Sequence, residues 1–181
     1  IADLHVPRSL RKIVKRGEFT VTHDRAFEDV IGTCATPGPT RPSTWINRPI
    51  REAFITLHHQ GVAHSIETWQ EGRLVGGLYG LSVGAVFCGE SMFSSINNAS
   101  KVALVHLCAR LWRAGYQLLD TQFTNPHLEQ FGVYEISNQA YLDKLQDALC
   151  VEPDFHLSDD ATGRDERALI EAFLSRADPA I

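Results

Sequence analysis

The sequence HSIETWQ (residues 64–70), EG (71–72) and RLVGGLY (73–79) predicts a β-hairpin. Two runs that contain β-branched and aromatic residues stand on either side of a Glu-Gly pair, which is typical of a tight turn between strands. Residues 85–89 predict another strand directly after this hairpin. Residues 116–123 are largely apolar, so we expect a further strand there, near the centre of the sheet.

Helical patterns surround these strands. Residues 98–114 predict a long helix whose apolar side chains recur at i, i+3, i+4 and i+7, namely Leu104, Leu107, Cys108 and Leu111. Shorter helices are expected over residues 9–16, 27–31, 49–60, 126–131, 138–149 and 167–175, and a short strand over 19–22. The order of these segments predicts an α/β fold of the α+β type, in which helices flank a mixed, mainly antiparallel sheet.

Length and composition fit one domain with a small appendage. The chain has 181 residues, of which 44% are hydrophobic and 22% charged, as in ordinary soluble globular proteins. No apolar run reaches the roughly 18 to 20 residues that a membrane-spanning helix needs. We expect a domain over residues 1–152, with a basic helix at 1–17, and an acidic C-terminal tail over 153–181.

Cysteine and histidine spacing argues against a disulfide framework and against a dedicated metal site. The four cysteines are widely separated and form no CxxC pair, which indicates a reducing, cytoplasmic setting. None of the eight histidines has HExxH spacing, and the adjacent His58 and His59 point apart on a helix. The sequence therefore predicts no bound metal.

Positive charge is concentrated near the N-terminus of a chain whose net charge is −5. Four basic side chains share one helical face, because they repeat at i, i+4, i+7 and i+8: Arg8, Lys12, Lys15 and Arg16. This face is either a solvated helix surface or a contact to the phosphates of a nucleic acid. Trp45, at the end of a loop rich in Pro, Gly and Thr, either stacks on a base or belongs to the core.

Asp120 and Gln122 are candidates for chemistry. They alternate on the strand expected at residues 116–123, so their side chains should project to the same face. A carboxylate in a largely apolar strand is costly to bury without a partner. Two interpretations remain: Asp120 caps a neighbouring loop, or the carboxylate and the amide face a ligand together.

The segment FCGESMFS (residues 87–94) brings a second carboxylate to the end of a strand. Glu90 either caps the following turn or holds a polar group at the bottom of a pocket. The GxSxG motif of serine hydrolases is incomplete here, because its second glycine is missing. Residues 73–77 are partly similar to the coenzyme A loop of N-acetyltransferases, but they lie within a strand and not before a helix N-terminus. Use of coenzyme A or a nucleotide therefore has weak support.

Six blocks of sequence carry a resemblance to a known family. They are TWI (44–46), AHSIE (63–67) followed by Trp69, LVGGLYG (74–80), FCGESMFS (87–94), NASK (98–101) and LDTQ (119–122). In this order they resemble the leucyl/phenylalanyl-tRNA–protein transferases, and the resemblance extends over residues 4–149.

The resemblance implies a cytoplasmic, monomeric bacterial enzyme with an N-acetyltransferase (GNAT)-like fold and no cofactor. Such an enzyme moves Leu or Phe from aminoacyl-tRNA to the N-terminus of a protein that begins with Arg or Lys, which marks that protein for N-end-rule degradation. The N-terminal segment of the family, with its PWF-like and WWSPDPR-like blocks, has no counterpart here. A coenzyme A-dependent N-acyltransferase and a non-catalytic tRNA-binding remnant remain the alternatives.

The resemblance also assigns roles to residues. Asp120 and Gln122 match the catalytic pair, and we expect Asp120 to help remove the proton of the attacking amine while Gln122 orients it. The pocket for the Leu or Phe side chain would be formed by Leu78, Glu90, Met92, Ser94, Leu104, Leu107 and Leu111. The tRNA would be held by Trp45, at its terminal adenosine, and at its acceptor stem by Arg8, Lys12, Lys15 and Arg16.

Overall fold

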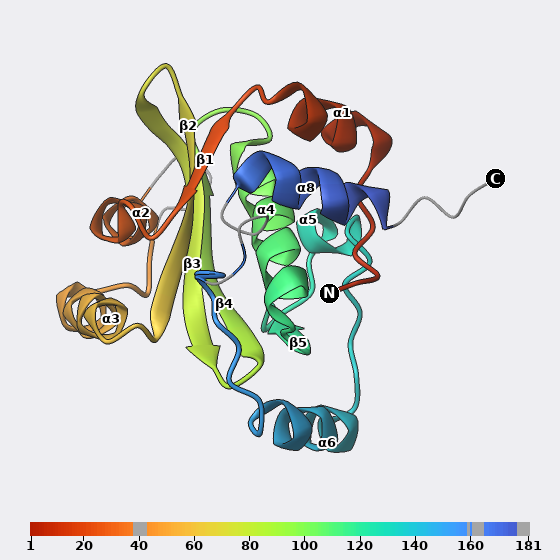
Figure 1. The fold of residues 1–181 in the computed structure, drawn as a ribbon. Helices are drawn as coiled ribbons and strands as arrows, with labels where there is room; N and C mark the ends of the chain where they lie inside the picture. The colour runs from red at the N-terminus through yellow and green to blue at the C-terminus, as the bar shows by residue number, and fades with distance from the viewer. Residues whose placement is uncertain (38–42, 159, 161–164, 177–181) are drawn as a thin grey trace.

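A five-stranded mixed sheet forms the centre of the computed structural model, which describes residues 1–37, 43–158, 160 and 165–176 (Figure 1). The strands lie side by side in chain order: β1 Thr20–His23, β2 Ala63–Gln70, β3 Arg73–Val83, β4 Val86–Ser94 and β5 Leu118–Asp120. The first four strands pair antiparallel, and β5 pairs in parallel with β4. The predicted mixed, mainly antiparallel sheet is thereby confirmed.

The hairpin between β2 and β3 has the predicted turn. Glu71 and Gly72 both have positive φ angles, 51° and 73°, as a two-residue type I′ turn requires. The third strand runs to Val83, beyond the predicted end at residue 79, because its last residues continue to pair with β4.

Helices cover both faces of the sheet. Their bounds are α1 Arg8–Arg16, α2 Phe27–Cys34, α3 Arg48–His59, α4 Ala99–Ala114, α5 Pro126–Glu129, α6 Asn138–Ala148 and α8 Glu166–Ser175. Helices α2 and α3 lie on one face, and α4 and α8 lie on the other (Figure 1). No helix in the described ranges combines the length and the apolar character that crossing a bilayer requires.

Helix α4 forms the centre of the main hydrophobic core. Its predicted apolar stripe is buried, including Leu104, Leu107 and Leu111. Opposite it, the sheet contributes Ile66 and Leu78, which are cross-strand partners on β2 and β3. The helix and this face of the sheet therefore enclose one continuous apolar layer.

The C-terminal segment, expected as an acidic tail, packs against this same layer. Phe155 and Leu157 are buried in the core. Helix α8 begins with Asp165 as its N-cap and buries one side against α4, with Leu169, Ile170, Phe173 and Leu174. The described part of residues 153–176 thus contributes to the domain core, because the acidic composition of the segment conceals an apolar helical face.

Candidate functional site

A cavity of about 800 Å³ opens where β4, α4 and the segment after β5 meet. Six of the predicted pocket residues line it: Leu78, Glu90, Met92, Ser94, Leu104 and Leu107. Leu78 and Met92 are neighbours across β3 and β4, and Leu104 and Leu107 face them from α4. The cavity therefore combines apolar surface from three elements, β3, β4 and α4, with one carboxyl group.

Two of the predicted pocket residues, Leu111 and Ser94, have contacts that differ from those expected of a pocket lining. Leu111 is fully buried in the main core and is not among the residues that line the cavity. It lies one helical turn beyond Leu107, where α4 continues under the sheet and away from the opening. Ser94 lines the cavity, but its hydroxyl donates to the Ile96 carbonyl and accepts from the backbone N–H of Ser100, so it also caps the start of α4.

Glu90 is placed at the cavity by a β-bulge. Tyr79 pairs with Ser91 and Gly80 pairs with Gly89, so Glu90 has no opposite residue on β3. Gly80 is required at this crossing, because an added Cβ would lie 2.2 Å from the Cys88 carbonyl oxygen. Burial, together with the charge of Asp120, raises the pKa of Glu90, and a hydrogen bond from Gln122 only partly opposes this rise.

Asp120 and Gln122 lie near each other, but not on one strand as predicted. Strand β5 ends at Asp120, and Gln122 follows in a turn with a φ of +65°. The Asp120 carboxylate causes this turn by accepting a hydrogen bond of 2.7 Å from the Gln122 backbone N–H. The Gln122 side chain then reaches back to β4, where its amide donates to the Gly89 carbonyl at 3.1 Å.

A second cavity, of about 730 Å³, lies on the other side of this turn. Asp120 and Gln122 line it, whereas Leu119 and Thr121 line both cavities. The β5 end therefore forms the wall between the two cavities. The carboxylate caps a turn, as one of the two interpretations of Asp120 proposed, and it also lines a cavity. That it faces a ligand together with Gln122 stays a prediction.

Tyr141 on α6 is a site residue that the sequence pattern did not indicate. Its hydroxyl donates to the second carboxylate oxygen of Asp120 at 2.8 Å. This hydrogen bond, with burial and the Asp120 charge, raises the pKa of Tyr141 to about 12. Both oxygens of Asp120 thus accept a hydrogen bond, one from the adjacent turn at Gln122 and the other from Tyr141 on α6.

His127 at the first cavity was also missed. It lies on α5, where a single histidine in a short polar segment carries no recognisable motif. Its Nε2 atom is buried and has no hydrogen-bond partner within the described residues. Burial, and then the charge of Lys101, lowers the pKa of His127, which favours the neutral ring.

The residues expected to hold tRNA lie outside both cavities. The four basic side chains of α1 are exposed, while Leu10 and Val14 bury the opposite side of that helix. Trp45 precedes α3 on the other face of the sheet and is half exposed, so it does not belong to the core. Neither set lines either cavity.

By fold, the described part of the chain is an α/β protein with one mixed sheet, and two cavities adjoin at the end of β5. By sequence, it belongs to the leucyl/phenylalanyl-tRNA protein transferase family, whose sequence model matches residues 1–146. A leucyl/phenylalanyl-tRNA–protein transferase from Hyphomonas neptunium is 51% identical over 90% of this chain and 63% of its own length. One from Paramagnetospirillum magneticum is 55% identical over 80% of this chain and 69% of its own.

A third relative with the same description, from Caulobacter vibrioides, is 51% identical over 91% of this chain and 76% of its own length. The chain therefore spans about two thirds of the curated relatives it matches. Among solved structures, a ribosomal-protein-alanine N-acetyltransferase from Brucella melitensis biovar Abortus 2308 matches with 12% identity and a TM-score of 0.44. That match covers 66% of this chain and 92% of the acetyltransferase.

Proposed function

We propose that this chain transfers Leu or Phe from aminoacyl-tRNA to the N-terminal residue of an acceptor protein that begins with Arg or Lys. The observation that carries the proposal is the sequence match to the leucyl/phenylalanyl-tRNA protein transferase family over residues 1–146. The strand residues that line the two cavities lie within this range. The product would enter N-end-rule degradation in the cytoplasm, and the chain would act as a monomer.

The first cavity suits the side chain of the transferred amino acid. Leu78, Met92 and Leu104 give it an apolar lining. Such a lining favours large apolar side chains that have no branch at Cβ, such as Leu and Phe. A difference of one methylene group changes the free energy of binding in an apolar pocket by about 1 to 3 kcal/mol. The ester carbonyl would then lie toward Leu119 and Thr121, the residues shared with the second cavity.

The second cavity suits the acceptor. Asp3, Asp120 and Glu135 line it, against one lysine, Lys144. This excess of carboxylates favours an N-terminal residue with a positive side chain. The acceptor amine would thus approach from one cavity and the ester carbonyl from the other, which is the orientation that brings two reactants together at a shared wall.

The reaction is the aminolysis of an ester. The amine nitrogen attacks the ester carbonyl carbon, the bond from that carbon to the ribose oxygen breaks, and the amine proton ends on the ribose hydroxyl. Asp120 accepts the amine proton as it leaves and passes it on. The Gln122 amide N–H groups bond to Gly89 and Glu90, which leaves the amide oxygen to accept a hydrogen bond from the amine.

The exposed basic face of α1 and the half-exposed Trp45 would contact the tRNA, the first at acceptor-stem phosphates and the second at the terminal adenosine. Both surfaces lie outside the cavities. The α1 face would position the tRNA body, and Trp45 would position the nucleoside whose ribose carries the aminoacyl ester. Their contribution is separable from the chemistry by experiment.

The test measures transfer of labelled Phe from Phe-tRNA to a peptide with N-terminal Arg. Asp120→Asn should lower the transfer rate by about 100-fold or more, because it removes the charged proton acceptor while keeping the shape. Asp147→Asn is the matched control. Asp147 is an exposed aspartate on α6, outside both cavities, so this substitution should leave the rate unchanged.

Three outcomes would contradict the proposal. A near-normal rate in Asp120→Asn removes the proposed role of this carboxylate. Binding of tRNA without any transfer by the unmodified chain indicates a tRNA-binding remnant. Thermal stabilisation by acetyl-coenzyme A, without transfer from tRNA, indicates an N-acyltransferase.

A further inference from the structure

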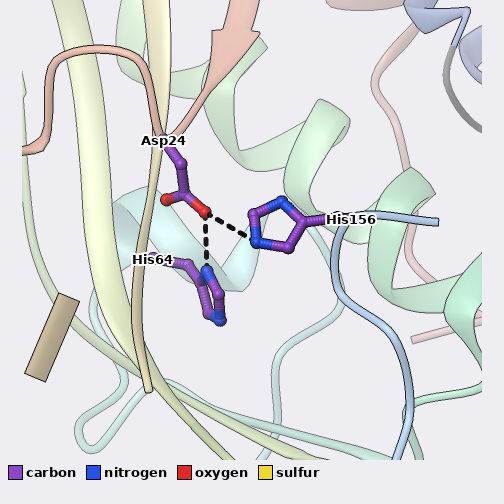
Figure 2. A group of neighbouring side chains, drawn as sticks. All are labelled: Asp24, His64 and His156. Carbon is purple, nitrogen blue, oxygen red and sulfur yellow. Dashed lines mark hydrogen bonds and ion pairs between the residues drawn. The ribbon is translucent and has the colours of Figure 1, made fainter. Parts of the chain in front are cut away.

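A cluster of histidines surrounds one carboxylate away from both cavities. Asp24 follows β1, His64 lies at the start of β2, and His156 belongs to the segment that leads to α8. One ligand atom from each residue lies within 4.8 Å of the other two (Figure 2). None of the three lines either cavity, so the cluster is separate from the proposed transfer site.

Asp24 is held rigidly with one oxygen free to face the rings. Its Oδ1 atom accepts the Ser65 backbone N–H at 2.8 Å, and its own backbone N–H donates to the Ser65 carbonyl at 3.1 Å. Its φ is +54°, a left-handed conformation that is uncommon outside glycine and that concentrates at functional positions. The second oxygen, Oδ2, faces the histidines and lies within hydrogen-bond distance of His64 Nδ1.

Both histidines turn a ring nitrogen toward this same oxygen (Figure 2). The Nδ1 atom of His64 lies 2.7 Å from Asp24 Oδ2, and Nε2 of His156 lies 3.7 Å from it. The His64 ring is buried and stacks on Phe155 at 4.0 Å between centroids, so the neighbour of His156 fixes its orientation. His156 is half exposed, which leaves one side of the cluster open to solvent.

A simple Asp–His hydrogen bond accounts for His64 but not for His156. A distance of 3.7 Å is too long for a hydrogen bond, although His156 points at the same oxygen. The neighbouring His58 does not compete for the position, since its Nδ1 bonds to the Ala63 carbonyl at 2.9 Å. A cation between the three groups would satisfy all of them at once.

We propose that Asp24, His64 and His156 bind one divalent transition-metal ion, with Zn²⁺ as the best fit. Two imidazole nitrogens and one carboxylate oxygen are typical zinc ligands, and the solvent-exposed side leaves room for water as the fourth. Ligand atoms around tetrahedral zinc lie about 3.3 Å apart, a spacing reached here by small shifts of two rings. Binding needs the His64 proton on Nε2, so that the Nδ1 lone pair faces the metal.

The metal would join the sheet to the C-terminal segment. Phe155 and Leu157, on either side of His156, are already buried in the main core. A bond from His156 to an ion on Asp24 and His64 would fix this segment against β1 and β2. Binding of the ion would therefore stabilise the fold, and it does not depend on the proposed transfer reaction.

The test uses the whole chain, freed of metal with a chelator and titrated with Zn²⁺ by calorimetry. One ion per chain should bind, and a saturating excess should raise Tm by about 5 °C. Substitution of Co²⁺ should give the visible absorption of a tetrahedral site. His156→Ala should weaken binding by at least about tenfold and abolish the absorption.

Two further variants keep the result interpretable. His59→Ala, which removes an exposed histidine outside the cluster, should bind Zn²⁺ as the unmodified chain does. Asp24→Asn keeps the size of the side chain and should also weaken binding. The proposal is overturned if the metal-free chain binds no Zn²⁺, or if it binds equally well with His156→Ala, which would assign the ion to other residues.

Discussion

Tyr141 and Asp120 illustrate how single residues set the chemistry of the proposed active site. The Tyr141 hydroxyl and the Gln122 backbone N–H each donate to a different oxygen of Asp120. The carboxylate is therefore fixed in orientation before any substrate arrives. Since the pKa of Tyr141 is raised to about 12, its hydroxyl remains a donor throughout the physiological pH range.

Removing that donor should impair catalysis more than binding. Tyr141→Phe keeps the ring but loses the hydrogen bond, so kcat for Phe transfer should fall about tenfold, which corresponds to one charge-assisted hydrogen bond. KM for aminoacyl-tRNA should stay within about twofold, because Tyr141 does not line the first cavity. Steady-state kinetics measure both constants. An unchanged kcat would show that Gln122 alone positions the carboxylate.

At the residue scale, the sequence predicted that Asp120 and Gln122 lie together but not how they are held. It paired Asp120 with Gln122 by strand alternation, whereas the Asp120 carboxylate ends the strand by bonding to the backbone at Gln122. The competition between a side-chain acceptor and the strand ladder depends on neighbours that the sequence does not show. Tyr141 was missed for the same reason, because α6 reaches β5 only in the folded chain.

At the scale of elements, one largely buried ionic group adds to the apolar packing of α8 on α4. Glu166, at the start of α8, contacts two residues of α4. It accepts a hydrogen bond from the Arg110 guanidinium, and its Oε2 atom lies 3.0 Å from Nδ1 of His106. His23 on β1 also approaches it, with Nδ1 at 3.4 Å from Oε1. Burial alone would raise the pKa of Glu166, but hydrogen bonds from the two histidines and the Arg110 charge outweigh it and hold that pKa well below its usual range.

Glu166→Gln should therefore destabilise the fold by about 3 kcal/mol, because it leaves the Arg110 guanidinium buried without its counter-charge. Urea unfolding at neutral pH measures the loss. Glu171→Gln on the same helix is the control: its pair with Arg167 is exposed, so its effect should stay within about 0.5 kcal/mol. Equal effects of the two variants would contradict a buried ionic attachment.

Glu166 should also make the stability of the fold depend on pH, with a loss of stability in acid. Its folded pKa is depressed, so its contribution is complete above its unfolded pKa of about 4.3 and is lost as the pH falls below that value. The difference in unfolding free energy between the unmodified chain and Glu166→Gln should shrink as the pH is lowered from about 6 to about 3. A constant difference over this range would contradict the depressed pKa.

Elements that depend on the local sequence pattern were predictable, and elements that depend on contacts between distant parts of the chain were not. The turn at Glu71 and Gly72 and the stripe on α4 follow from local pattern alone. The packing of α8 did not, since its apolar face is short and embedded in an acidic segment. Its place depends on that face and on the contacts of Glu166 with His106 and Arg110 of α4, which are about sixty residues away along the chain.

At the scale of the whole molecule, charge is divided between two surfaces. The chain carries a net charge of −5, yet α1 exposes four basic side chains, and the charged side chains that line the second cavity are three carboxylates and one lysine. A tRNA and a basic peptide would thus be attracted to different regions. This division would allow an acidic protein to bind a nucleic acid through one helix.

Replacing Lys12, Lys15 and Arg16 together by Glu should weaken tRNA binding and reduce the salt dependence of the affinity. Loss of up to three phosphate contacts lowers the slope of log K against log salt by up to about 3. Filter binding at a series of salt concentrations measures it. Arg73→Glu, at the exposed hairpin turn, is the control and should not change the slope. An unchanged slope in the triple variant would identify the α1 face as solvated surface.

The extra residue in β4 also changes the parity of that strand. Phe87 and Met92 both belong to the layer beneath α4, although one number is odd and the other even. Alternation counted forward from Phe87 would place Met92 on the opposite face, and only Glu90 restores it. A substitution at position 90 therefore changes one side chain only. Deletion of residue 90 would instead move the core-facing side chains of the second half of β4 to the opposite face of the sheet.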